Sequence, residues 1–508
     1  MTLDELNSYE KPSDATRRVS IFTINGTLKD LETIAILDQR KTEWRSMWIS
    51  IAMQFVVGVQ ISIFYMSMWP YLSGLDPTAD MDFLGWVVAA CNIGCTFSNP
   101  IYGWWNQRTM SVKWPTIVGF IIAAVGQAFY GMVGVLDNNV KWYMLAARII
   151  TGVGVGNLAA LRAYGATASV PHDRLKAISF GTAGFVFGIS FGPAIQAFFT
   201  PLGENGFKIG PIPVNMYTSA AYLMTILCLA ASVFMFFFFH EDYAGIIEDK
   251  EKQDNEFMKV PKYDLGPALI CIYLYMIVSM IATNIEVMST PLSTVLFDWK
   301  DSQSVMYNGI IESITCLVSV SINLLIGFTR IGKIDKRIQI IVGLVFFLLY
   351  HLVNYPWPFY PHPLHYIPEG SNTTVVGGCL PSYEWCAHTS RVPLPVYIFA
   401  FIVFFGIAFP FVESPAAALY SEILGPRKQG TMQGLFSFGG SVSQFASPIL
   451  ATFLFQHSGY KYVIVTQICT LSVAFLLMAV FYRRLHPLLM KPKIFQKAVY
   501  KGGVFYAL

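Results

Sequence analysis

Apolar segments long enough to cross a lipid bilayer recur about twelve times along this chain of 508 residues. A helix needs about 20 residues to cross a hydrocarbon core of roughly 30 Å. We place the segments near residues 46–72, 82–104, 115–136, 141–165, 174–198, 215–240, 265–290, 303–328, 336–355, 394–418, 430–454 and 460–484. A chain in lipid must satisfy its own backbone hydrogen bonds, and no alternating ten-residue strands occur, so these segments predict α-helices.

The composition favours the same class of protein and excludes others. The chain is 54% hydrophobic and only 13% charged, which is more apolar surface than a soluble core can hide. A net charge of +3 does not indicate a nucleic-acid partner. No HExxH, GxxxxGK[ST] or GxSxG motif is present, so we expect no enzyme, no cofactor and no bound metal. The partner that the composition does require is the lipid bilayer.

Positive charges are distributed unevenly between the loops. Alternate short loops are rich in Lys and Arg, while the intervening loops carry about half as many. The rich loops contain Arg108, Lys113, Arg174, Lys176, Arg330, Lys333, Lys336, Arg337, Arg427 and Lys428. By the positive-inside rule, these loops and both termini are expected in the cytosol.

A repeat at half the chain length predicts two similar halves. The stretch from Ala147 to Ile195 is echoed between Tyr420 and Leu450, with Tyr164 answering to Tyr420. A tandem duplication of this kind predicts two pseudo-symmetric six-helix bundles, with the substrate path between them. The expected organisation is a disordered cytosolic tail (1–44), a first bundle (45–240), a charged cytosolic linker (241–264), a second bundle (265–486) with a lumenal loop (356–393), and a second cytosolic tail (487–508).

Glycines spaced four residues apart mark two of the predicted helices. A small residue at every fourth position lines one helix face and lets a neighbouring backbone approach closely. These residues are Gly152, Gly156, Gly184, Gly188 and Gly192. We interpret them as packing residues that also allow the halves to rock; direct contact with a ligand is the alternative.

Two arginines within the fourth span are candidate anion-binding residues. An ionisable group in the bilayer centre costs about 3 kcal/mol or more, so it is kept mainly beside a cavity or a partner. Arg148 and Arg162 are fourteen residues apart, close to four helical turns, and are expected on the same face. Both are assigned to the path of an anion, although Arg148 could be a structural ion pair and Arg162 could reach the lipid headgroups instead.

Three carboxylates complete the candidate path. Glu286 lies beside Thr290 and Pro291, where we expect the helix to break, and Glu312 lies within the eighth span. Glu413 is flanked by Pro410 and Pro415, which predicts a kinked gating segment. Each could carry a proton or simply neutralise an arginine. We expect Glu286 to be either the counter-charge of Arg148 or a proton carrier, and we interpret His351 as an interfacial residue.

The lumenal loop and the first tail carry candidate modification and sorting sites. Asn372 begins a glycosylation sequon, and Cys379 and Cys386 are expected to form a disulfide because no second pair of metal ligands is near. In the tail, Glu32, Ile36 and Leu37 fit an acidic dileucine signal that sorting adaptors bind; an accidental apolar patch is the alternative.

Several motifs resemble those of the major facilitator superfamily. Arg148 with Gly152, Gly154 and Gly156 is similar to its fourth-helix pattern, and the run Gly184, Gly188, Gly192 and Pro193 to its fifth-helix pattern. The segment from Gly103 to Arg108 resembles its gate motif, but Asn106 stands where an Asp is usual, which puts the gate's charge relay in doubt.

A closer resemblance is to the lysosomal branch of that superfamily. It covers residues 45–484 and is strong in the first helix (67–90) and the fourth (143–164), with further matches at 290–292, 307–311 and 420–426. The resemblance implies a lysosomal membrane protein that supports chloride conductance. The duplicated fold implies a carrier, and the alternative function is a proton-coupled carrier of a small organic solute. An anion channel and a non-transporting scaffold are the remaining classes.

Overall fold

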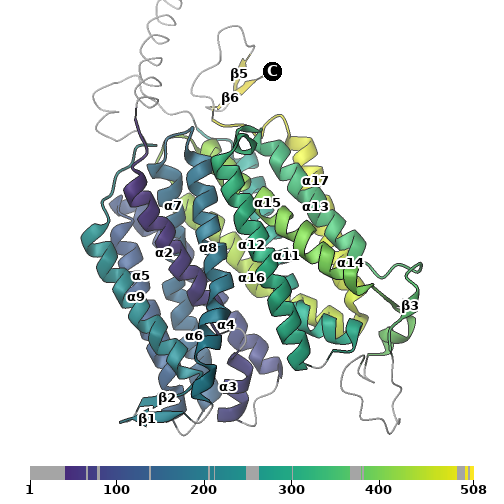
Figure 1. The fold of residues 1–508 in the computed structure, drawn as a ribbon. Coiled ribbons are helices and arrows are strands. Elements are labelled where there is room, and N and C mark those ends of the chain that lie inside the picture. The colour runs from purple at the N-terminus through teal and green to yellow at the C-terminus, as the bar shows by residue number, and fades with distance from the viewer. Residues whose placement is uncertain are drawn as a thin grey trace, which may run out of the picture.

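A computed structural model of the chain describes residues 40–64, 67–76, 81–136, 139–203, 206–210, 212–246, 262–299, 301–365, 379, 383–488, 498–501 and 504–507. These residues form long helices joined mostly by short loops, with three small hairpins (Figure 1). The predicted all-α membrane protein is confirmed. The tail residues Glu32, Ile36 and Leu37 and the sequon residue Asn372 lie outside the described residues.

The helices of the first half pack around one apolar core. They are α2 (Trp44–Ser62), α3 (Met68–Leu75), α4 (Met81–Thr109), α5 (Lys113–Met132), α6 (Val140–Val155), α7 (Leu158–Ala168), α8 (Arg174–Phe198) and α9 (Thr218–Phe238). Short 3₁₀ turns cover Val133–Val135 and Thr200–Leu202, and a hairpin of β1 (Phe207–Ile209) and β2 (Ile212–Val214) precedes α9.

The helices of the second half pack around a separate core, beside the first bundle (Figure 1). They are α11 (Leu265–Phe297), α12 (Asp301–Phe328), α13 (Lys336–Asn354), α14 (Leu394–Phe399), a π-helical segment (Ala400–Phe405), α15 (Gly406–Leu424), α16 (Gly430–Ser458) and α17 (Tyr460–Phe481). Turns of 3₁₀ helix cover Arg330–Lys333 and Glu384–His388. The other hairpins pair β3 (His362–Pro363) with β4 (Ser390–Arg391) and β5 (Ala498–Lys501) with β6 (Val504–Ala507).

Twelve spans account for the two bundles. Within the described residues, ten stretches are long and apolar enough to cross a membrane. The other two spans are α2 with α3, and α4, whose 29 residues are long enough at about 1.5 Å per residue. We expected the helix to break beside Pro291, but α11 continues through this residue. A membrane-spanning helix tolerates such a proline because neighbouring helices and side chains satisfy the backbone groups that the proline leaves unpaired.

The fourth span is irregular at Gly156 and Asn157, although the backbone stays right-handed helical through both residues. It divides at Gly156 and Asn157 into α6 and α7, after a run of glycines that are poor helix formers. Arg148 lies on α6 and faces the interior of the first half, whereas Arg162 lies on α7 and contacts the second half.

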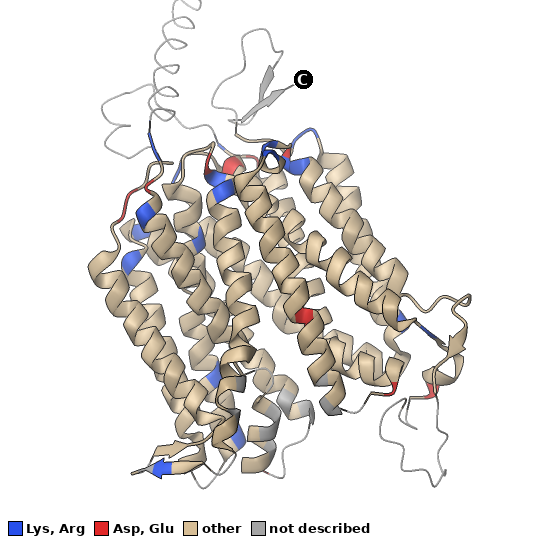
Figure 2. Ribbon diagram, in the orientation of Figure 1, with Lys and Arg blue, Asp and Glu red and all other residues tan. Residues whose placement is uncertain are grey.

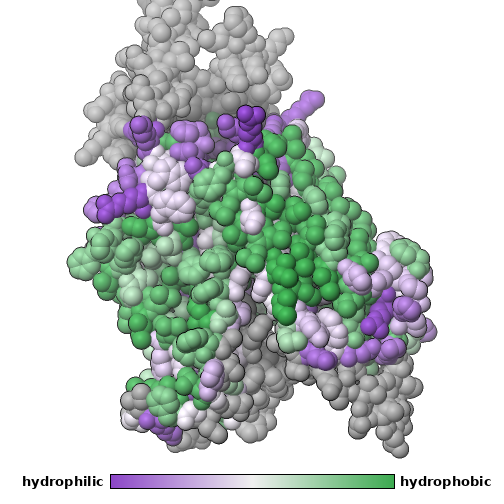
Figure 3. Space-filling model, in the orientation of Figure 1, coloured by the Kyte–Doolittle hydropathy of each residue, from purple (hydrophilic) through white to green (hydrophobic). Residues whose placement is uncertain are grey.

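Both described ends of the helical domain lie at one end of the bundle, which we call the terminal end; the opposite end is the distal end (Figure 1). Lys and Arg gather at the terminal end (Figure 2). An apolar belt separates the polar regions at the two ends (Figure 3). The β3–β4 hairpin lies at the distal end, where a disulfide joins Cys379 to Cys386.

Glycines allow α8 to lie directly on α2. A Cβ at Gly188 would lie 2.2 Å from the Phe55 carbonyl oxygen, and one at Gly192 would lie 2.0 Å from Ser62 Oγ. Gly184 faces Ile51 in the same interface.

A second glycine interface joins α6 to α4. A Cβ at Gly152 would lie 2.0 Å from the Cys91 carbonyl oxygen, and one at Gly156 would lie 2.0 Å from Ser98 Oγ. The helix spacing in the first half thus depends on residues that have no side chain.

We expect Gly188→Leu to lower the melting temperature of the detergent-solubilised protein, because its side chain would have to displace the α2 backbone. Overpacking of this kind costs about 1–3 kcal/mol. The matched control is Gly165→Ala, since a Cβ at Gly165 meets no atom within 4 Å. Equal melting temperatures for Gly188→Leu and the unmodified protein would contradict the close packing of α8 on α2.

Candidate functional site

An ion pair joins the two halves of the molecule. Arg162 Nη2 of α7 lies 3.1 Å from Glu413 Oε1 of α15, and the side chains are only 15% and 4% exposed. Arg162 Nη1 donates a hydrogen bond to the hydroxyl of Tyr275 on α11. The guanidinium also lies over the rings of Tyr275 and Phe185. Arg162 is therefore held inside the protein and does not extend to the lipid headgroups.

Glu413 lies in an irregular part of the second half. Pro410 and Pro415 both fall inside α15, and a π-helical segment precedes that helix. Each proline removes one backbone hydrogen bond, and π-turns are frequent where a helix must change shape. The second oxygen of Glu413, Oε2, is buried and has no partner among the described residues. The segment thus combines a strong link between the halves with a weakened helix.

Arg148 is the most deeply buried cation of the described chain. It is 1% exposed, and neither Nε nor Nη1 has a hydrogen-bond partner among the described residues. Its guanidinium lies 5.7 Å from the ring centre of Phe64. The chain thus places a charge within the first half without a carboxylate partner in the described part of the structure.

Unpartnered polar side chains lie near Arg148. The ring of Phe64 lies tilted against that of Tyr130, with 4.4 Å between ring centres, and Tyr130 contacts Tyr71. Gln60 lies on α2, about one turn before Phe64, which follows the end of that helix. Gln127 lies one turn before Tyr130 on α5, so both amides occur at a similar depth. Both amides and both phenols are buried without hydrogen-bond partners among the described residues. Such groups normally have a partner, so this region is chemically incomplete.

Glu286 of α11 and Glu312 of α12 form a second cluster. They lie close enough to interact electrostatically and are partly buried. Tyr397 and Cys316 lie within electrostatic range of Glu312. Two carboxylates in one low-dielectric site repel each other unless a proton or a cation is shared between them.

Glu286 was expected to be the counter-charge of Arg148 or a proton carrier, and no ion pair joins the two residues in the described part of the structure. Arg148 contacts the ring of Phe64 within the first half. Glu286 instead interacts with Glu312 in the second half. The described ion pair between the halves is made by Arg162 and Glu413.

Amides and glycines close the terminal end between α4 and α16. A Cβ at Gly103 would lie 2.5 Å from the carbonyl oxygen of Gly430. The side chain of Gln107 accepts a 2.8 Å hydrogen bond from the backbone N–H of Thr431 at the start of α16. Asn106 Oδ1 also reaches Gly430. Neutral side chains thus hold this contact at the place where the related gate motif carries a charge.

Other gate residues have different roles from those the motif implied. Arg108 lies on the surface over the ring of Trp104, one turn earlier on α4. A carboxylate does bind nearby: Glu241, after α9, accepts hydrogen bonds from Ser111 Oγ and from the N–H groups of Val112 and Lys113. It stabilises the start of α5 and so provides a negative charge that the α4–α5 loop lacks.

Sequence reasoning missed several residues of these clusters. Tyr275, Gln60 and Gln127 are uncharged, and only their position as isolated polar residues in apolar spans could have indicated them. His351 was expected at the membrane interface, but it is 2% exposed and lies inside the second half. Residues on neighbouring helices bury His351, and the spacing of residues along α13 does not show which helices those are.

Comparisons with known proteins agree with this architecture. The family model described as Major Facilitator Superfamily matches residues 50–366 and 371–502. The chain is 28% identical over 491 residues to Major facilitator superfamily domain-containing protein 8 of Xenopus laevis, which covers 90% of this chain and 94% of that protein.

Solved structures of transporters share the fold. The human organic anion transporter MFSD10 (TETRAN) has a TM-score of 0.61 at 14% identity, covering 86% of this chain and 100% of that one. The proton:xylose symporter XylE, bound to 6-bromo-6-deoxy-D-glucose, has a TM-score of 0.63 at 15% identity, covering 87% and 96%. The chain therefore belongs to the major facilitator superfamily, a family of membrane transporters.

Proposed function

We propose that this protein moves a small anion, with chloride as the first candidate, across the lysosomal membrane. The observation that carries the proposal is Arg148, a buried guanidinium with two nitrogen atoms that lack partners among the described residues. A cation at this depth is costly unless a negative group accompanies it. A transported anion would supply the missing charge and the missing hydrogen-bond acceptors.

The surrounding groups suit a small anion. Phenol hydroxyls and amide N–H groups donate hydrogen bonds, and Tyr71, Tyr130, Gln60 and Gln127 all have unpartnered atoms. A solved relative by fold is described as an organic anion transporter, which supports the anionic class but not a particular solute.

Transport would require the halves to separate at the terminal end. There, the Gly103–Gly430 contact and the Gln107–Thr431 hydrogen bond hold α4 against α16. The Arg162–Glu413 ion pair adds a link between α7 and α15. In a carrier that works by alternating access, opening the path toward the terminal end would break these contacts. In a channel, anions could pass while the contacts remain intact.

A proton-coupled carrier of a small organic solute is the second candidate. The specific observation is that Glu286 and Glu312 lie within electrostatic range of each other, because two neighbouring carboxyl groups can hold and release one proton. In this mechanism the pair would take up a proton from the acidic lumen and release it on the cytosolic side.

The proposal assigns the terminal end to the cytosol and the distal end to the lumen, in line with the positive charge at the terminal end (Figure 2). Lysosomal delivery is attributed to sorting adaptors that bind the tail at Glu32, Ile36 and Leu37.

Arg148→Gln should lower chloride flux into reconstituted vesicles by about tenfold, because loss of one charge-assisted hydrogen bond costs about 1.5 kcal/mol. Arg148→Lys should retain part of the flux, since the charge persists while the planar fork is lost. Flux is followed with a chloride-sensitive dye, with and without a pH gradient.

The matched control is Arg45→Gln, because Arg45 is exposed at the start of α2. Normal flux in Arg148→Gln, at equal reconstitution, would make Arg148 a structural residue. A flux far above carrier turnover and insensitive to the pH gradient would indicate a channel.

The proposed orientation predicts two modifications of the distal loop. Asn372 should carry a glycan, and Cys379 and Cys386 should react with a thiol label only after reduction. The glycan is detected as a glycosidase-dependent shift on a gel, with Asn372→Gln as the control. Labelling of both thiols in unreduced protein from cells, together with no shift, would place this loop in the cytosol.

A further inference from the structure

A series of polar side chains on α12 faces α15. Thr315, Ser319 and Asn323 are spaced four residues apart, so they lie about 6 Å from one another along one face of α12. All three are buried, with exposed fractions of 2%, 4% and 0%. Buried polar groups in an apolar span need hydrogen-bond partners. These partners lie on α15 and on the π-helical segment that precedes it.

The middle residue of the series, Ser319, replaces a hydrogen bond that α15 cannot make within its own backbone. In a regular helix the carbonyl of Gly406 would accept a hydrogen bond from the N–H of residue 410, but Pro410 has no N–H. Ser319 Oγ donates to this carbonyl at a distance of 2.9 Å. A buried carbonyl without a donor is unfavourable, so α12 supplies from the side what Pro410 removes.

The two other residues extend this support along α15. Ser414 Oγ donates a 2.8 Å hydrogen bond to Asn323 Oδ1, and Asn323 Nδ2 donates a 3.2 Å hydrogen bond to the carbonyl of Ser319. Asn323 is therefore held by its own helix and in turn holds Ser414. In the other direction, Thr315 Oγ1 donates a longer hydrogen bond, of 3.4 Å, to the carbonyl of Phe401 in the π-helical segment.

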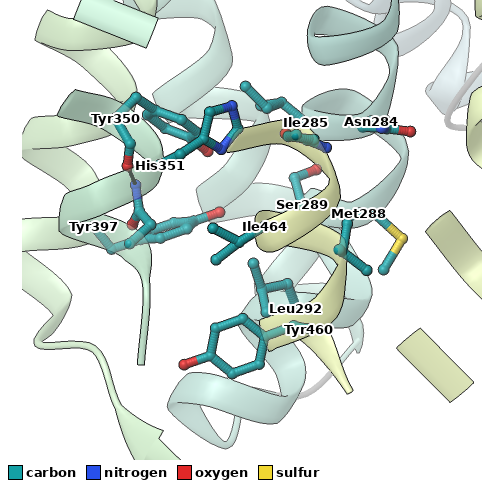
Figure 4. Close-up of a pocket in the computed structure, with 13 residues that line it drawn as sticks. Asn284, Ile285, Met288, Ser289, Leu292, Tyr350, His351, Tyr397, Tyr460 and Ile464 are labelled. Carbon is teal, nitrogen blue, oxygen red and sulfur yellow. Dashed lines mark hydrogen bonds between the residues drawn. The ribbon is translucent and has the colours of Figure 1, made fainter. Parts of the chain in front are cut away.

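Aromatic side chains of α13 also pack against the π-helical segment. The ring centre of Tyr350 lies 6.3 Å from that of Phe401 and 6.1 Å from that of Phe405. Figure 4 shows Tyr350 together with Tyr397 of α14 at the edge of a cavity of about 50 Å³. Ring contacts are less directional than hydrogen bonds, and the cavity leaves the rings room to shift. The directional contacts that fix the rotation of α15 therefore come from α12.

The residue that α12 holds is adjacent to the ion pair between the halves. Ser414 follows Glu413, whose carboxylate binds Arg162. Neighbouring residues on a helix point about 100° apart, so fixing Ser414 also fixes the direction of Glu413. We propose that Ser319 and Asn323 are positioning residues, because they hold α15 in the rotation that lets Glu413 bind the first half. They act through the ion pair and so control how readily the halves separate at the terminal end, a step that rests on the proposed function.

The first test is a double-variant cycle on Ser319 and Pro410. Ser319→Ala should lower the melting temperature of the detergent-solubilised protein on the order of 2 °C, because the Gly406 carbonyl loses its donor. In the Pro410→Ala background a backbone N–H can bind that carbonyl, so Ser319→Ala should have much less effect. The matched control is Ser321→Ala, since Ser321 is exposed and its hydroxyl donates within α12. Equal losses in the two backgrounds would overturn the role assigned to Ser319.

The second test reports separation of the halves at the terminal end. Ser437 lies on α16 between Gly434 and Ser441, which both contact α4, and it is 5% exposed. In Ser437→Cys, the new thiol should react with a charged, membrane-impermeant reagent only while α16 and α4 are apart. Labelling is read by mass spectrometry of the peptide that contains residue 437, because Cys469 is also exposed.

In the Ser437→Cys background, Asn323→Ala should raise the labelling rate about tenfold, the effect of losing one buried hydrogen bond. Added to Glu413→Gln, it should raise the rate no further, because Asn323 acts through the ion pair. Ser414→Ala removes the same hydrogen bond and should show the same pattern, so it decides the question if Asn323→Ala does not fold. Ser321→Ala should leave the rate unchanged.

Two results of the labelling experiment would overturn the positioning role. One is an additive effect of Ser414→Ala and Glu413→Gln, which would show that the hydrogen bond only stabilises the bundle. The other is equal labelling of Glu413→Gln and its parent, which would show that the ion pair does not hold the terminal end closed. Neither test measures flux, so absence of anion flux in the unmodified protein would reject the proposed function alone.

Discussion

The ion pair between Arg162 and Glu413 is the interaction on which the arrangement of the two halves depends. Both side chains are removed from water, so either one alone would be an expensive buried charge, and the partner must come from the opposite half. Tyr275 adds a hydrogen bond from a third helix. The same demand for compensation accounts for the other clusters, because a guanidinium or carboxylate inside a bundle requires a partner, a proton or a bound ion.

The two halves meet this demand differently. The first half contains Arg148 and neutral polar side chains without partners, which favours an anion. The second half contains Glu286 and Glu312 within electrostatic range of each other, which favours a proton. Close glycine contacts fix the helices around both regions. A duplicated fold has thus acquired opposite electrostatic character in its two bundles, with a breakable ion pair between them.

Much of the fold could be predicted because apolar length and glycine spacing are local properties of one helix. The twelve spans and the two bundles followed from them. Partners across helices could not be predicted, since periodicity gives the face of a helix but not its neighbour. Arg162 and Glu413 were both selected as path residues, yet their pairing was missed. His351 proved buried because α11 and α17 cover it.

The most direct test is chloride flux through protein reversibly cross-linked at the terminal end. In the double variant Gln107→Cys/Thr431→Cys, the new thiols replace side chains at the contact between α4 and α16. Single variants treated with the same thiol cross-linker serve as controls. If the halves must separate at this end, flux should stop on cross-linking and return on reduction. Undiminished flux through fully cross-linked protein would contradict alternating access and favour a path that stays open while the halves remain joined.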